Sequence, residues 1–228
     1  MEPVVQLRGA VTLLGRFPAL AGIDLEVAAG EVVLLRGSNG AGKTTLLRCL
    51  AGLVPLARGE GQVLGHDLTD RRQARALRRR VGLLGHATGL YDELTAVDNV
   101  RFWGRAGGAR PEDVDAALDA CGLGGRVGGL VVARLSAGQR RRTALACLLA
   151  CRPELWLLDE PHAGLDHDGR DLLDDLVRRA RDSGATVVLA SHELDRAEGL
   201  ADRVVTIAGG TVAPPVPAEA PEEPALVP

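Results

Sequence analysis

Residues 31–45 read EVVLLRGSNGAGKTT, an apolar run of valine and leucine that leads into a glycine-rich loop. The run over residues 31–36 lies between glycines, which is typical of a buried parallel strand. The loop matches the pattern GxxxxGK[ST], and leucines at helical spacing follow it. A strand, a glycine loop and a helix in this order are the context that a phosphate-binding loop needs. The sequence therefore predicts a site for nucleotide phosphates at the start of that helix.

This glycine loop supplies most of the predicted contacts to the nucleotide. Its glycines allow backbone N–H groups to turn inward around the phosphates, and the helix directs its positive end at them. We expect Lys43, the single lysine among 27 basic residues, to bridge the β- and γ-phosphates. The Thr44 hydroxyl is expected to hold Mg²⁺. The predicted nucleotide-binding residues of the loop are Gly37, Ser38, Asn39, Gly40, Ala41, Gly42, Lys43, Thr44 and Thr45.

A second apolar run, LWLLDE over residues 155–160, is typical of a buried strand that ends in two carboxylates. We expect Asp159 to hold Mg²⁺ through water, and Glu160 to polarise the attacking water. The alternative is that both residues are surface acids at the end of a strand. The glycine loop favours the catalytic interpretation.

The chain alternates strands with helices, which indicates an α/β fold with a parallel sheet. Strands are predicted over residues 4–7, 23–27, 81–84 and 186–190, with a final hairpin of 204–207 and 211–212. Helices are predicted over residues 168–181 and 195–200, with a helical, Ala-rich region over 97–151 and a solvated, arginine-rich helix over 71–80. Residues 213–228 are rich in Pro, Ala, Glu and Val, which predicts a flexible tail.

Composition excludes several classes of protein. The 228 residues are 46% hydrophobic and 25% charged, which suits one large domain or one domain with a subdomain and excludes a disordered chain. A net charge of −3 and an aromatic content of 2% argue against a nucleic-acid binder. No run of about 18 apolar residues and no secretory signal is present. The four cysteines lack metal-type spacing and are expected to be buried, reduced thiols.

A third motif, LSAGQ over residues 135–139, precedes a long helix that begins with three arginines. It resembles the signature of ABC ATPases, whose usual form is LSGGQ, with Ala137 in place of the first glycine. The stretch AGLD that ends at Asp166 resembles the D-loop of that family. Ser191 and His192 follow a predicted strand and resemble its switch-histidine loop. The resemblance covers residues 4–212.

This resemblance implies a fold and a set of roles. ABC ATPases are P-loop NTPases with a RecA-like parallel-sheet core, an N-terminal antiparallel β subdomain and an inserted α-helical subdomain. The implied domain spans residues 1–212, with the helical subdomain at about 86–151. Catalytic roles are implied for Lys43, Glu160 and His192, with His192 contacting the γ-phosphate. The residues implied to bind the ATP of a partner subunit are Ser136, Ala137, Gly138 and Gln139.

Partners and cofactors follow from the same resemblance. One copy of each motif implies a homodimer or a pair of cassettes, with ATP and Mg²⁺ at the shared interface. A lone cassette without a spanning segment implies separate integral membrane subunits. The expected location is cytoplasmic, peripheral on the inner face of the cell membrane, and no nucleic-acid partner is expected.

Two positions depart from the family pattern. The Q-loop position, which normally carries Gln, holds His86. Neutral imidazole is a poor Mg²⁺ ligand, but it could hydrogen-bond the attacking water or couple to the membrane subunit; the alternative is a histidine that only caps a loop. The aromatic residue expected to stack on adenine is absent at Leu14, and Phe17 either takes that role or packs in the core.

A narrower resemblance is to the haem-exporter type, the ATPase of cytochrome c maturation systems. It rests on LGH ending at His86, on ELT followed by NVRFW over residues 93–103, and on LSAGQ followed by three arginines. We therefore expect export of haem through separate membrane subunits. Two alternatives remain: the ATPase of another exporter, for drug, lipid or polysaccharide, and a non-transport regulatory ATPase.

Overall fold

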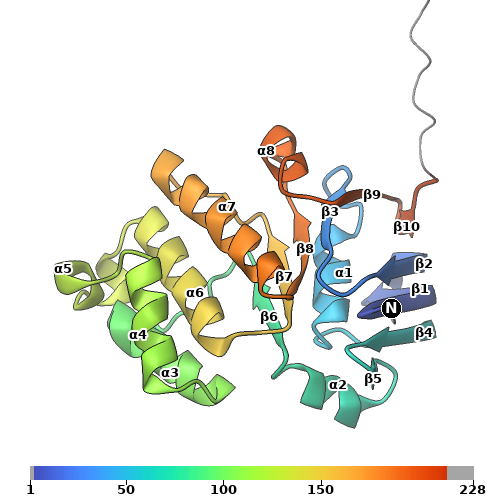
Figure 1. Ribbon diagram of the computed structural model, residues 1–228. Coiled ribbons are helices and arrows are strands. Elements are labelled where there is room, and N and C mark those ends of the chain that lie inside the picture. Colours follow the sequence, from blue (N-terminus) through green and yellow to red (C-terminus); the bar gives the residue numbers. More distant parts are fainter. Residues whose placement is uncertain (1–2, 215–228) are drawn as a thin grey trace, which may run out of the picture.

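A computed structural model describes residues 3–214 as two sheets with surrounding helices (Figure 1). The larger sheet has the strand order β10-β9-β3-β8-β7-β6, in which every neighbouring pair except β10 and β9 is parallel. Its strands are β3 (Val32–Arg36), β6 (Val81–Leu84), β7 (Leu155–Asp159), β8 (Thr186–Ala190), β9 (Arg203–Ala208) and β10 (Thr211–Val212). The predicted bounds of β6 and β8 are confirmed. Every residue of β7 and β8 is buried, which explains their uninterrupted apolar sequences.

The smaller sheet is antiparallel, with the order β2-β1-β4-β5. Its strands are β1 (Val5–Leu14), β2 (Phe17–Val27), β4 (Arg58–Val63) and β5 (His66–Asp67). The sequence predicted parts of the first two strands, over residues 4–7 and 23–27, and missed the long hairpin that joins them. It also missed β4, whose sequence RGEGQV carries few strand-favouring residues and pairs with β1.

A group of helices lies between β6 and β7 in the chain and at one end of the molecule (Figure 1). Its elements are α3 (Ala96–Gly107), α4 (Pro111–Ala120), α5 (Gly125–Gly128), the 3₁₀ helix η1 (Val132–Arg134) and α6 (Ala137–Cys151). Both α3 and α4 pack against α6, which is buried along most of its length. These helices occupy the stretch for which the sequence predicts an inserted helical subdomain, residues 86–151.

The remaining helices are α1 (Lys43–Leu50), α2 (Arg71–Leu77), α7 (His167–Asp182) and α8 (Leu194–Glu198). The amphipathic pattern predicted for residues 168–181 is confirmed in α7, which buries one apolar face against the sheet. The arginines of α2 are exposed, which confirms the predicted solvated face over residues 71–77. The helix ends before residue 80, its predicted end, because Arg80 is half-buried and forms an ion pair with Glu154. This helix begins after Asp70, whose carboxylate accepts hydrogen bonds from the N–H groups of Arg72 and Gln73.

The larger sheet separates two hydrophobic cores. Val32 and Leu34 of β3 belong to the core that also contains α6 and α7, while Val33 and Leu35 belong to the core beneath α1 and the smaller sheet. This alternation follows from the two-residue period of a strand. Because both faces are covered by apolar side chains, polar chemistry is confined to the edges where the strands end.

Three further expectations concern the chain ends and the cysteines. The predicted tail, residues 213–228, lies almost wholly outside the described residues. All four cysteines are free thiols; Cys151 is half-buried and the other three are buried. Within residues 3–214, no helix is both long and apolar enough to cross a membrane.

Candidate active site

The glycine loop, residues 37–42, leaves the carboxyl end of β3 and leads directly into α1. Lys43 opens that helix with its side chain folded back over the loop. Its Nζ atom donates hydrogen bonds to the carbonyl oxygens of Gly37 at 2.7 Å and Ser38 at 3.1 Å. The ammonium group is therefore held at the centre of the loop, although Lys43 is only 7% exposed.

Two glycines of this loop are required by its surroundings. Gly37 has a φ of +151°, and a Cβ atom there would lie 2.2 Å from the carbonyl oxygen of Ile207. Gly42 has a φ of +112°, and its Cβ would lie 2.7 Å from the carbonyl oxygen of Ala19. The loop thus passes so close to β9 and β2 that any side chain at these positions would collide with backbone.

A cleft of about 400 Å³ brings most of the predicted site together. Its lining residues are Leu14, Ala19, Asn39, Gly40, Ala41, Gly42, Lys43, Thr44, Thr45, His86, Asp159, Glu160 and His192. Residues from the carboxyl ends of β3, β6, β7 and β8 meet here, as expected for a ligand site of an open parallel sheet. The sequence predicted all of these residues except Leu14 and Ala19.

Glu160 follows β7 in an unusual backbone conformation. Its φ is +48°, which a residue with a side chain rarely adopts, and its N–H donates to the carbonyl oxygen of Ala190 at 2.8 Å. The Glu160 carboxylate accepts a hydrogen bond from the backbone N–H of His192 at 2.9 Å and lies 3.2 Å from its Nε2. Backbone strain of this kind is concentrated at functional sites. Two residues that are 32 positions apart thus form one unit at the cleft.

The two positions that depart from the family pattern are both located by the structure. His86 is exposed, follows β6 after one residue and lines the cleft. Phe17 is 79% exposed, so its alternative interpretation as a core residue is wrong. Leu14, which pairs with Phe17 across the β1–β2 hairpin, is the residue of this hairpin end that lines the cleft. A stacking role for Phe17 stays a prediction.

The predicted signature lies apart from the cleft. Ser136 caps α6: its hydroxyl accepts the N–H of Gln139 at 3.2 Å, and the Gln139 side chain accepts the N–H of Ser136 at 3.0 Å. Within residues 3–214, the cleft lining includes no residue of 136–139. Gly138 instead approaches Gly164 of the predicted D-loop, since its Cβ would lie 3.3 Å from the Gly164 carbonyl oxygen.

Asp166 stabilises this second group of residues. Its carboxylate accepts the N–H of Gly169 at 2.9 Å, which caps α7, and it also binds the guanidinium of Arg142 at 3.2 Å. These hydrogen bonds lower the pKa of the Asp166 carboxyl, with the backbone bond from Gly169 as the main favourable contribution. The signature and the D-loop therefore form one surface of the chain, and the cleft forms another.

Sequence analysis missed Arg141. This residue is 5% exposed, and its guanidinium donates to four backbone carbonyls, those of Gly85, Asp159, Glu160 and Pro161, at 2.6–3.1 Å. A run of three arginines at the start of a helix normally indicates a solvated face. Nothing in the local sequence marks the middle arginine as the one that points inward.

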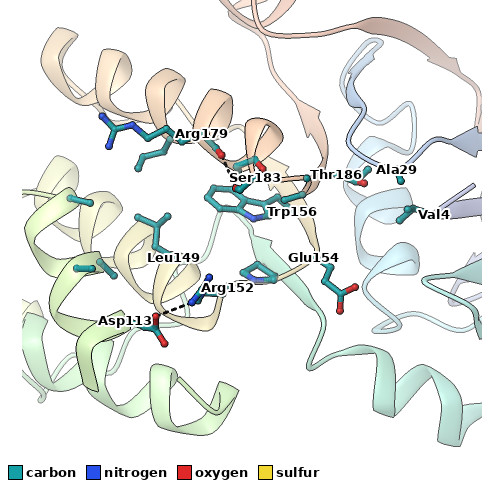
Figure 2. A pocket seen from close by; sticks show the side chains of 18 of the residues that line it. Val4, Ala29, Asp113, Leu149, Arg152, Glu154, Trp156, Arg179, Ser183 and Thr186 are labelled. Carbon is teal, nitrogen blue, oxygen red and sulfur yellow. Dashed lines mark hydrogen bonds and ion pairs between the residues drawn. The ribbon is translucent and has the colours of Figure 1, made fainter. Parts of the chain in front are cut away.

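A larger cavity of about 640 Å³ lies away from this chemistry (Figure 2). It is lined by Trp156 and Thr186, near the amino ends of β7 and β8, and by residues of α4, α6 and α7. The ion pair between Asp113 and Arg152 is drawn beside it. Because ligands of parallel sheets bind at the carboxyl ends of the strands, the smaller cleft is the better candidate site.

A family model described as ABC transporter matches residues 20–163. The chain belongs to the ABC transporter family. The Cytochrome c biogenesis ATP-binding export protein CcmA of Rhodopseudomonas palustris is 41% identical over 204 residues, covering 89% of this chain and 96% of that protein. The Daunorubicin resistance ATP-binding protein DrrA3 of Streptomyces coeruleorubidus is 38% identical over 218 residues, covering 92% and 67%.

A solved structure supports the same assignment. A dimeric ATP-binding cassette in a post-hydrolysis state, bound to ADP and Pi, superposes with a TM-score of 0.84 at 26% identity, covering 92% of this chain and 97% of that chain. The predicted fold of an ABC ATPase, with an antiparallel β subdomain beside a parallel-sheet core, is confirmed. This ABC ATPase is the ATP-hydrolysing subunit of a transporter. Its relatives at about 40% identity are named for different substrates, so family membership leaves the substrate open.

Proposed function

We propose that this ABC ATPase drives haem export in a cytochrome c maturation system. The observation that carries this proposal is the match to CcmA, at 41% identity over 96% of the length of that protein. The match to DrrA3 covers only 67% of the length of DrrA3. The LGH sequence ending at His86, and LSAGQ followed by three arginines, support the same subtype. An exporter for drugs is the second candidate, favoured by the 38% identity to DrrA3.

At the cleft, we assign the binding of ATP to the glycine loop and its hydrolysis to the carboxyl ends of β7 and β8. The Lys43 ammonium would leave the carbonyls of its own loop for the β- and γ-phosphate oxygens. The Glu160 carboxylate would accept a proton from the attacking water, while His192 orients Glu160 and contacts the γ-phosphate. His86 lines the same cleft and is assigned to the contact between this chemistry and the membrane subunits.

The chemistry of the donors fits Mg²⁺. Thr44 offers a hydroxyl and Asp159 a carboxylate in one cleft, and Mg²⁺ prefers oxygen ligands, usually one or two carboxylates with substrate phosphates. When bound, Mg²⁺ would neutralise charge on the phosphates.

A second copy of the chain, or a paired cassette, would complete the site. The signature residues at the start of α6 lie apart from the cleft of their own chain, so they are available to the nucleotide of a partner. Solved cassettes of this fold are described as dimeric, which supports the same arrangement.

The membrane subunits would contact a groove of about 310 Å³ between β6 and the helices α3 and α6. Beside it, Tyr91, Phe102 and Trp103 form a cluster of mutually packed rings, although aromatic residues make up only 2% of the chain. Tyr91 is 45% exposed and Phe102 is 43% exposed. Exposed aromatic clusters are typical anchors of protein interfaces. We place the cassette on the inner face of the cell membrane through this contact.

Deletion of the gene tests the substrate. Covalent haem in c-type cytochromes, measured by haem-peroxidase staining of membrane proteins, should disappear in the deletion strain and return with the wild-type gene. A gene carrying Glu160→Gln should fail to restore it, which shows that hydrolysis is required. Normal c-type cytochromes in the deletion strain, together with increased sensitivity to an exported drug, would instead support the second candidate.

A further inference from the structure

Arg141 lies in the first turns of α6, five residues after the signature serine, and its side chain points into the protein. Nε donates to the carbonyl oxygen of Pro161 at 3.1 Å, and Nη1 donates to that of Gly85 at 2.7 Å. Nη2 donates to the carbonyl oxygens of Asp159 at 3.1 Å and Glu160 at 2.6 Å. All three nitrogens of one guanidinium are therefore used to hold the backbone.

The four acceptors belong to the ends of two neighbouring strands. Gly85 follows β6 and immediately precedes His86, while the other three acceptors follow one another at the end of β7. Arg141 thus holds the backbone of Glu160, which carries the proposed catalytic carboxylate, and the carbonyl of the residue immediately before the Q-loop histidine. Arg141 is absent from the cleft lining given above. It therefore contacts those residues through their backbone carbonyls and not from within the cleft.

Burial of the Arg141 guanidinium disfavours its charged form. Desolvation lowers the pKa of Arg141 to about 10, while the charges of Asp159 and Glu160 oppose that shift. The guanidinium consequently remains a cation at neutral pH. In the described structure its hydrogen-bond partners are backbone carbonyls, whose dipoles solvate the charge in place of water.

Glu160 is the residue that most needs such support. Its φ of +48° is strained, and the strained peptide is held on both sides, by Ala190 at its N–H and by Arg141 at its carbonyl oxygen. Releasing one of these hydrogen bonds would allow the backbone to relax and the carboxylate to turn away from His192. A misplacement of about 1 Å can lower a rate by about 100-fold.

We propose that Arg141 is a positioning residue for ATP hydrolysis, which fixes the backbone of Glu160 and Gly85 so that the Glu160 carboxylate is aligned with the attacking water. This inference rests on the catalytic role proposed for Glu160. A positive charge alone cannot perform this positioning role. A lysine ammonium has one nitrogen and cannot span carbonyls at the ends of two strands.

The first test is Arg141→Lys in the purified full-length chain. We expect kcat for ATP hydrolysis to fall by about 10- to 100-fold with KM for ATP changed by less than about threefold. Binding of a fluorescent ATP analogue and the melting temperature would establish that the variant is folded. Arg178→Lys is the matched control, because Arg178 is exposed on α7 and pairs with Asp175 one turn away. A folded Arg141→Lys enzyme with wild-type kcat would overturn the proposal.

A double-mutant cycle then separates positioning from a general loss of structure. If Arg141 acts through Glu160, adding Arg141→Lys to Glu160→Gln should slow single-turnover hydrolysis by less than about twofold further. A further loss equal to that of Arg141→Lys alone would overturn the proposal.

A second variant is used if Arg141→Lys folds poorly. Millimolar guanidinium added to Arg141→Ala should restore part of kcat. No restoration of kcat in a folded Arg141→Ala variant would overturn the proposal. A fully active Glu160→Gln enzyme would instead refute the proposed catalytic role of Glu160.

Discussion

At the scale of single residues, the proposed hydrolysis depends on the contact between Glu160 and His192. The carboxylate accepts the backbone N–H of His192 and lies 3.2 Å from its Nε2, and the Glu160 backbone is strained. In the proposed role of general base, a carboxylate fixed in this way needs little reorganisation when it accepts a proton from the attacking water.

Glu160→Gln should therefore slow ATP hydrolysis by about 100-fold or more, since a general base contributes at least that much. Nucleotide affinity should be retained, because the glycine loop and Lys43 are unchanged, and an ATP-bound dimer should accumulate. Steady-state ATPase assays and gel filtration with ATP measure both effects. Glu60→Gln, an exposed substitution on β4, serves as the control. Full activity in Glu160→Gln would remove this residue from catalysis.

His86 is the residue whose role the family pattern describes least well. It is exposed and lines the cleft, so it can reach either the nucleotide site or a membrane subunit. If it orients water or couples to the transporter, His86→Ala should lower transporter ATPase activity by about 10-fold, or about 1.4 kcal/mol in barrier height. His86→Gln should preserve much of the activity, because Gln restores the usual oxygen ligand. Equal activities of wild type and both variants, measured with the membrane subunits present, would leave His86 without such a role.

At the scale of elements, the glycine loop is shaped by the strands around it. The amino acids of the loop allow the turn, but β2 and β9 determine how closely it must be wound. These strands constrain Gly37 and Gly42, where a Cβ atom would collide with backbone. At Gly40 φ is +78°, but a Cβ atom would meet open space.

Gly42→Ala should destabilise the fold by about 1–3 kcal/mol, because it combines an unfavourable φ with a collision at the Ala19 carbonyl. Gly40→Ala is the matched comparison, with backbone strain and no collision, and should have the smaller effect. Urea denaturation of both variants measures the difference in the free energy of unfolding. Equal stabilities would mean that the loop moves away from β2 at little energetic expense.

At the scale of the whole molecule, the predicted site is divided between two surfaces. The cleft collects the glycine loop, the acids and two histidines, whereas Ser136 and Asp166 belong to the surface formed by the starts of α6 and α7. A site that used both surfaces, as proposed above, would therefore require two chains.

Mixed dimers test this division. Lys43→Ala should weaken nucleotide binding in its own cleft, and Ser136→Arg should obstruct the γ-phosphate of the partner, so each homodimer should be inactive. A mixture of the two variants contains heterodimers in which the intact cleft of one chain faces the intact signature of the other. We expect ATPase activity to reappear on mixing. An active Ser136→Arg monomer, or a mixture as inactive as its components, would contradict a shared site.

The cysteines report on the packing of the whole chain. Burial raises the pKa of Cys49 to about 11 and that of Cys121 to about 12, and it also raises the pKa of Cys147 and Cys151. Thiolate is the reactive form, and a thiol of pKa 11 is only about 0.1% ionised at pH 8. Iodoacetamide at pH 8 should modify the half-buried Cys151 first and the other three mainly after denaturation, as measured by mass spectrometry. Rapid modification of all four in the native protein would contradict the packing.

The sequence by itself determined the features that depend on neighbouring residues. Strand propensity and apolar burial specify β6 and β8 to the residue, and the glycine pattern specifies the loop before Lys43. The predictions that failed, on the β1–β2 hairpin and β4, concern strands whose stability comes from cross-strand partners far away in the chain.

Tertiary structure alone decided which of these features meet. The contact of Glu160 with His192 exists because β7 and β8 are neighbours in the sheet, and the four carbonyls of Arg141 converge because β6 lies next to β7. The same packing buries the middle one of three arginines and leaves Leu14 at the cleft with Phe17 exposed. Local backbone preferences act over a few residues, whereas strand order and side-chain packing depend on the free energy of the whole folded chain.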